Sequence, residues 1–187
     1  MESALVLPSE AQTTAFLAER AAVNDAAYLQ PDDSALCALT DFRHEHPITV
    51  HADSFVGDAL RDMNHRSVHA LLVTREVEFG IGEQVVGMIT YFDIERRHSH
   101  RYPHGTLSMQ FSRLRVAEVM APCEELSLVN YHSLQSLSAS DLYEMFQGTG
   151  LTHLLVIERH GNGSTLARGL LSRASLTMRL HRARTAR

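Results

Sequence analysis

The chain has 187 residues, of which 44% are hydrophobic and 21% are charged, and its formal net charge is −5. These values are ordinary for a globular protein, and the negative charge argues against a general nucleic-acid binder. No apolar run approaches the roughly 20 residues of a membrane span, and the first residues lack a signal-peptide pattern. We therefore expect a cytoplasmic protein that is not in the membrane.

Residues 1–37 are predicted to form an N-terminal helical extension. The stretch from Ser9 to about Leu29 is rich in alanine and contains neither glycine nor proline, which favours a helix. Pro31 ends it, because a proline pushes the preceding residue out of the helical region. One apolar stripe of this helix can hold four side chains: Phe16, Leu17, Ala21 and Tyr28.

Residues 38–97 are predicted to form a first repeat with the order strand, helix, strand, strand, helix. The apolar runs at 47–50, 70–73 and 85–89 are typical of short strands. Asp53 or Ser54 is a suitable cap for a helix that runs to about His65. Thr90 caps the second helix, whose acids come early and whose arginines come late.

A polar linker over 98–115 precedes a second repeat over 116–182, and a basic tail over 183–187 follows it. The second repeat is predicted to begin with a short helix over 116–121 and a strand over 125–129, followed by an extended loop over 131–137. Ser138 or Ser140 caps the next helix. Strands over 153–157 and 168–171 follow, and Ser172 begins the last helix.

The two repeats are an internal duplication. Gly169 follows Gly87 by 82 residues, and in both places the glycine is followed by two apolar residues and then a hydroxyl residue. Upstream, the Leu-Leu-Val run starting at Leu154 follows the run starting at Leu71 by 83 residues. We therefore expect an α/β (α+β) fold of two pseudo-symmetric repeats. Halves of about 60 residues are marginal alone, which predicts a shared core.

The repeats resemble the tandem cystathionine-β-synthase (CBS) domain pair, or Bateman module. The resemblance covers about residues 38–182 and depends on Val119–Pro122, the Leu-Leu-Val runs and the two Gly-apolar-apolar-Thr/Ser turns. It implies two pseudo-symmetric units with two clefts between them, in which an adenosine-containing ligand such as AMP, ADP, ATP or S-adenosylmethionine binds. It also implies a homodimer that regulates another, unknown protein and needs no obligatory cofactor.

In the family, a Thr or Ser followed three residues later by Asp contacts the ribose, and here these residues are Thr90 and Asp93. An ionised carboxylate accepts strong hydrogen bonds from a ribose diol. The same pattern is also nearly a helix capping box, which needs no ligand, and both roles can coexist. The adenine is expected against strand starts at Ile48, Val50 and Ala70, residue types that also suit a plain core.

The second repeat is expected to hold a weaker site at Ser172 and Arg173, because Ser175 stands where the first repeat has its acid. Phe92 stands just before Asp93, where the family often has a basic residue that meets phosphates. The two sites are therefore predicted to be asymmetric.

Other function classes fit less well. The sequence has no catalytic triad motif, phosphate-cradling glycine loop or metalloprotease signature, so we expect no enzyme. A structural scaffold without a ligand is the main alternative. A metal site is a weaker alternative. Imidazole binds zinc and nickel, but the candidate histidines lack a recognisable ligand spacing. These candidates are His44, His46, His98, His100 and His104.

Overall fold

The computed structural model describes residues 5–6, 28–76, 83–101, 113–161 and 165–185. These residues divide into two compact units, each of which is described by itself. Of the described residues, unit 1 contains 5–6 and those within 47–126, and unit 2 contains 28–46 and those within 127–185. Residues 9–27 of the expected N-terminal helix lie outside the described part of the chain.

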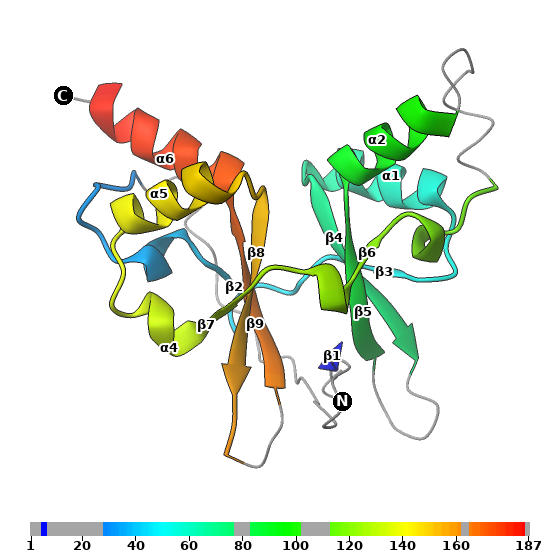
Figure 1. Cartoon of the computed structure of the whole chain (residues 1–187), viewed down its shortest axis with the longest axis horizontal. Coiled ribbons are helices and arrows are strands. Elements are labelled where there is room, and N and C mark those ends of the chain that lie inside the picture. Colours follow the sequence, from blue (N-terminus) through cyan, green and yellow to red (C-terminus); the bar gives the residue numbers. More distant parts are fainter. Residues whose placement is uncertain (1–4, 7–27, 77–82, 102–112, 162–164, 186–187) are drawn as a thin grey trace. The chain divides into compact units, whose positions relative to one another are not determined.

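Unit 1 is a mixed sheet covered by helices (Figure 1). Strand β5 lies between β1 and β4, β3 is parallel to β4, and β4 is antiparallel to β5. Strand β6 adds to β5. The elements are β1 (Leu5–Val6), β3 (Thr49–His51), α1 (Val56–Arg66), β4 (Ala70–Glu76), β5 (Glu83–Thr90), α2 (Tyr91–Arg101), η2 (Val116–Glu118), β6 (Ala121–Pro122) and η3 (Cys123–Glu125).

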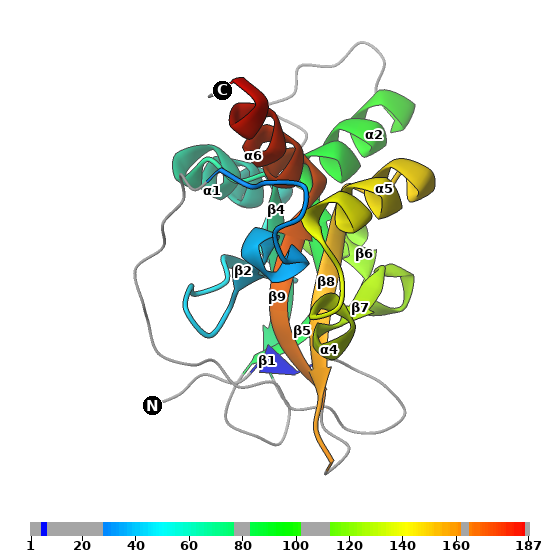
Figure 2. The ribbon, with the colours of Figure 1, turned by 90° about the vertical axis from the view of Figure 1, so that its left-hand side faces the viewer.

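Unit 2 repeats this plan with a sheet in the order β2-β9-β8-β7. Helices α5 and α6 pack against each other beside the sheet (Figure 2). The elements are η1 (Ala35–Ala38), β2 (Thr40–Asp41), β7 (Leu128–Asn130), α4 (Tyr131–Leu134), α5 (Ala139–Thr149), β8 (His153–Arg159), β9 (Thr165–Ser172) and α6 (Arg173–Thr185). Helix α4 replaces the extended loop expected here, because the Asn130 side chain caps it by accepting from the His132 N–H at 2.9 Å.

Each unit has its own hydrophobic core. In unit 1, Met63 of α1 packs with Leu71 of β4 and Ile89 of β5. In unit 2, Phe146 of α5 and Leu176 of α6 belong to a second buried cluster. The expectation of a core shared between the repeats stays a prediction, because each unit is described by itself. Burying apolar side chains of this size contributes about 1.5–3 kcal/mol each, which lets a small unit form a core of its own.

The unit boundaries differ from the expected repeat boundaries, because two short segments pair outside their own repeat. Strand β2, expected in the first repeat, is antiparallel to β9 of unit 2. Strand β6, expected in the second repeat, is antiparallel to β5 of unit 1. The chain thus passes from unit 2 to unit 1 near Pro47 and returns near Ser127.

The repeated glycines lie where these two segments pair. Gly87 is opposite Pro122 of β6, and a Cβ on Gly87 would overlap the Ala121 carbonyl oxygen. Gly169 is opposite Asp41 of β2, and a Cβ there would overlap the Thr40 carbonyl oxygen. The duplicated glycine is therefore explained by close backbone approach of a pairing strand.

Candidate functional site

In unit 1 the predicted ligand residues gather where β4 begins and β5 ends. Ala70 pairs with Thr90 across the two strands, and the Leu72 N–H donates to the Ile48 carbonyl at 3.1 Å. Ile48 and Ala70 are half-buried. Val50 lies further along β3 and belongs to the hydrophobic core. The structure therefore brings Ile48, Ala70 and Thr90 to one end of the sheet, and both Val50 and the partly buried Ile48 pack with the core cluster of unit 1.

Asp93 and Thr90 form a reciprocal cap at the start of α2. The Thr90 hydroxyl and the Thr90 N–H donate to Oδ2 of Asp93 at 2.6 and 3.0 Å, respectively. In return the Asp93 N–H donates to the Thr90 hydroxyl oxygen at 3.1 Å. This is the capping-box arrangement that the sequence pattern left open. Both Thr90 donors use one carboxylate oxygen, Oδ2.

Helix α5 carries the same arrangement at a place with no expected ligand role. The Ser138 hydroxyl and N–H donate to Oδ2 of Asp141 at 2.6 and 2.9 Å, and the Asp141 N–H donates to the Ser138 hydroxyl at 3.1 Å. These hydrogen bonds from Ser138 lower the pKa of the Asp141 carboxyl. The geometry of Asp93 is therefore what a helix cap alone produces, and Asp141 is a natural control for it.

The corresponding end of the sheet in unit 2 has different chemistry. His153 pairs with Ser172 at the place where unit 1 pairs Ala70 with Thr90. The Ser175 N–H reaches the Ser172 hydroxyl at 3.5 Å, with no carboxylate in this turn. Arg173 begins α6 and is half-buried. The sequence difference between the repeats is thus a difference between an acidic and a basic helix start.

The first turn of α2 presents aromatic rings and an acid. Phe92 is 61% exposed, and the Tyr91 ring meets the His69 ring edge-on with 6.5 Å between centroids. Asp93 is the acidic residue of this turn. The side chain that precedes Asp93 is therefore an exposed aromatic ring, with no positive charge for a phosphate group.

A buried ion-pair cluster in unit 2 was not predicted. Arg168 of β9 is 6% exposed, and its Nε and Nη2 donate to the two oxygens of Asp41 at 2.9 and 2.7 Å. Its Nη1 donates to Glu158 at 2.9 Å, and Arg43 donates to the same Glu158 oxygen at 2.9 Å. The guanidinium also lies over the Tyr131 ring, 4.2 Å from its centroid. An arginine inside an apolar strand was the only sequence signal for this cluster.

The charges of this cluster stabilise one another. Burial raises the pKa of Asp41, but hydrogen bonds from the Arg168 side chain and the Arg43 backbone outweigh it, so the pKa lies below its ordinary value. Burial alone would lower the pKa of Arg168. The hydrogen bonds of Arg168 to Asp41 and Glu158 outweigh this effect, so the pKa of Arg168 lies above its ordinary value. Because Asp41 belongs to β2, the cluster fastens this two-residue strand to the sheet of unit 2.

Neither a metal centre nor a membrane span is found in the part of the chain that the structure describes. There, no group of three His, Cys, Asp or Glu side chains is arranged to hold a metal ion. His44 and His46 are exposed, whereas the side chains of His98, His100 and His104 lie outside the described residues. None of the described helices combines the length and the apolar character needed to cross a membrane.

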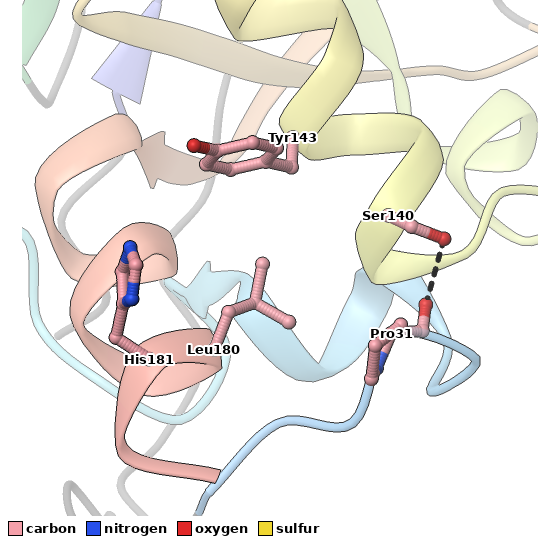
Figure 3. A pocket seen from close by; sticks show the side chains of 5 residues that line it. All are labelled: Pro31, Ser140, Tyr143, Leu180 and His181. Carbon is pink, nitrogen blue, oxygen red and sulfur yellow. Dashed lines mark hydrogen bonds between the residues drawn. The ribbon is translucent and has the colours of Figure 1, made fainter. Parts of the chain in front are cut away.

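A cavity of about 90 Å³ lies within unit 2, between α5 and α6 (Figure 3). It is lined by Pro31, Ser140, Tyr143, Leu180 and His181. None of the predicted ligand residues belongs to this lining.

The sequence and the fold were compared with known proteins. Residues 39–99 match the CBS domain family. The chain is similar to the structure of a CBS-domain containing protein from Agrobacterium tumefaciens, with 17% identity, a TM-score of 0.53, and coverage of 86% of this chain and 98% of that one. It is also similar to the CBS domain of a bacterial CNNM/CorC family Mg²⁺ transporter in complex with ATP, with 13% identity, a TM-score of 0.52, and coverage of 81% and 89%. No curated protein matches the sequence.

These similarities confirm the resemblance to CBS domains and the mixed α/β fold with two sheets. The family match ends at residue 99. The second half of the chain lies outside this match. It is related to the first half by the similarity of the whole fold to a CBS-domain containing protein and by the offsets of 82 and 83 residues between the repeats.

Proposed function

We propose that this protein, which carries a CBS domain at residues 39–99 and has the fold of CBS domain proteins, is a regulatory module that binds an adenosine-containing ligand. The observation that carries the proposal is the meeting of Asp93 and Thr90 with Ile48 and Ala70 at one end of the unit 1 sheet. An acid and a half-buried apolar surface suit the two parts of a nucleoside, its ribose diol and its base.

The capping bonds of Asp93 leave room for this role. Its bonds to Thr90 go through Oδ2, and the structure records no hydrogen bond from a described residue to the other oxygen, Oδ1. An ionised carboxylate has about four lone-pair sites, so capping by two donors does not exhaust its capacity. A ribose hydroxyl can thus donate to Asp93 while the cap persists.

The proposed ligand is AMP, ADP, ATP or S-adenosylmethionine, bound in unit 1 more tightly than at Ser172 and Arg173 in unit 2. The proposal is supported by a related fold, the CBS domain of the Mg²⁺ transporter, whose structure contains ATP. Under this proposal the protein is a cytoplasmic homodimer that reports ligand occupancy to a partner protein and does not catalyse a reaction. Such reporting requires the ligand to favour one conformation over another.

Thermal unfolding with adenosine, the three nucleotides and S-adenosylmethionine tests the proposal. A ligand that binds only the folded state at 100 times its Kd adds about 2.7 kcal/mol, so the unfolding temperature should rise with at least one compound. Guanosine and cytidine nucleotides provide the controls. An unchanged unfolding temperature with every adenosine compound would refute the ligand proposal.

The second candidate function is a scaffold that binds no small ligand. The matching caps of Asp93 and Asp141 favour it, because a cap explains the Thr90 and Asp93 geometry without any ligand. A ligand-independent dimer in sedimentation, together with no thermal shift, is the result expected for this alternative.

A further inference from the structure

The first turn of α2 carries a negative charge with no basic residue beside it. Asp93 is the acid of this turn, and the two residues before it, Tyr91 and Phe92, are uncharged. The hydrogen bonds that Asp93 accepts from Thr90 come from neutral groups, a hydroxyl and an N–H. Arg96 lies almost one turn further along α2 and is exposed, so water and salt screen its charge. The α2 side of this sheet end is therefore negative.

The backbone donors at this helix start are already engaged. The Thr90 N–H donates to the Asp93 carboxylate at 3.0 Å, and the Asp93 N–H donates to the Thr90 hydroxyl oxygen at 3.1 Å. Between them, the Tyr91 N–H donates to the His69 carbonyl at 2.9 Å. A helix start binds a phosphate through N–H groups that have no partner within the protein. The start of α2 therefore offers few donors to a phosphate group.

The corresponding turn of unit 2 shows that the fold does not require this acid. Helix α6 begins with the half-buried Arg173, and its first turn contains no acidic residue. There the Ser175 N–H lies 3.5 Å from the Ser172 hydroxyl oxygen, which is a long hydrogen bond. The duplicated turn thus forms with either charge. The negative charge of the unit 1 turn is therefore available to select a ligand.

We propose that the unit 1 site selects adenosine compounds by charge. It binds adenosine and S-adenosylmethionine, whose sulfonium group is positive, and it discriminates against compounds whose ribose carries phosphate. This inference rests on the proposed function, because it concerns the same site. A carboxylate that holds the ribose diol repels a phosphate joined to that ribose and attracts a sulfonium group joined to it.

Phe92 is the specificity-determining residue of this proposal. Its ring is 61% exposed and directly precedes Asp93, so a longer side chain fits at this position without disturbing the core. A basic side chain here would supply the cation that the first turn of α2 lacks. The uncharged ring of Phe92 therefore keeps the charge of Asp93 uncompensated.

Isothermal titration with two matched pairs of compounds tests this selectivity, at about pH 8, where histidine side chains are neutral. Binding at this site is the part of each titration that Asp93→Ala removes. We expect AMP to bind there about tenfold or more weakly than adenosine. S-adenosylmethionine should bind severalfold more tightly than S-adenosylhomocysteine, which lacks the methyl group and the positive charge on sulfur.

The outcomes separate this inference from the proposed function. Binding of AMP at this site as tightly as adenosine would overturn the inference and leave the proposed function standing. Equal affinities of the two sulfur compounds would also overturn it. No binding of any adenosine compound would refute both the inference and the proposed function.

Substitutions on α2 test the role of Phe92. Phe92→Arg should raise the affinity for AMP about tenfold or more and change that for adenosine little, because only AMP gains a charge partner. Phe92→Leu adds no charge and is the matched control, so it should keep the preference for adenosine. Unchanged AMP affinity in a Phe92→Arg protein that circular dichroism shows to be folded would contradict the role of Phe92. A loss of AMP affinity in Arg96→Gln would reveal a phosphate contact from α2 and would also overturn the proposal. The comparison of compounds on the unsubstituted protein stands even if Phe92→Arg fails to fold.

Discussion

Asp93 accepts two hydrogen bonds from Thr90 through a single carboxylate oxygen, at 2.6 and 3.0 Å. This relationship closes the first turn of α2 and leaves the other oxygen without a recorded partner among the described residues. This second oxygen is the one proposed to accept a hydrogen bond from a ribose hydroxyl.

The close approach at the repeated glycines predicts that both are intolerant of a methyl group. Gly87→Ala and Gly169→Ala should each destabilise the fold by about 1–3 kcal/mol or more, because the new Cβ meets a backbone oxygen that cannot rotate away. Gly148→Ala in α5 is the matched control, since a Cβ there meets nothing. It should be neutral or stabilising by about 0.5–1 kcal/mol. Urea unfolding measures all three, and equal effects would contradict this explanation of the repeat.

The Arg168 cluster predicts a large effect from removing one charge. Arg168→Met removes the main partner of Asp41 and Glu158, whose side chains are only 17% and 12% exposed. The free energy of unfolding, measured by chemical denaturation, should therefore fall by about 3–5 kcal/mol. Arg61→Met is the control, because its partner Asp58 is solvent-exposed and such pairs contribute about 0–1 kcal/mol. A loss at Arg168 no larger than that at Arg61 would show that the cluster does not hold β2.

The same cluster predicts an acid dependence of stability. The folded-state pKa of Asp41 lies below its ordinary value of 3.8, so the contribution of Asp41 to stability is complete above pH 3.8 and is lost as the pH falls through the folded-state pKa. Asp41→Asn should therefore reduce the slope of unfolding free energy against pH below about pH 4. Identical slopes for the two proteins would exclude Asp41 from the acid transition.

The two cysteines are predicted to differ in reactivity. Burial raises the pKa of the Cys123 thiol to about 12, with a smaller effect from Glu124, and its Sγ donates to the Val85 carbonyl. Cys37 is exposed. A thiol reagent at pH 8 should therefore modify Cys37 quickly in the native protein and Cys123 only after denaturation. Mass spectrometry measures the modification of each thiol. Fast reaction of both thiols in the native protein would contradict the buried position of Cys123 in η3.

Much of the fold could be predicted because its signals are local and duplicated. The Leu-Leu-Val runs became the central strands β4 and β8, and Thr90 ended β5 as expected. The exchange of β2 and β6 could not be predicted, because a two-residue strand has no periodicity to recognise. The glycine repeat was visible, but its cause lies in a pairing partner distant in the sequence.

The site was predictable only to the level of two alternatives. Thr90 and Asp93 have the same residue spacing in a cap and in a ribose site, so sequence cannot separate the two roles. The structure shows the cap and places Ala70 beside it. It assigns Val50 to the core, where its neighbours rather than its residue type decide its role.

The most direct test of the central claim is a nucleotide titration of Asp93→Ala alongside Asp141→Ala. Both changes remove the acid from a capping box of the same geometry, so they should lower stability by similar, modest amounts. By isothermal titration with the adenosine compound that gives the largest thermal shift, we expect Asp93→Ala to weaken binding at least tenfold and Asp141→Ala to leave it unchanged. Equal affinity in the two variants would show that Asp93 is a helix cap and nothing more.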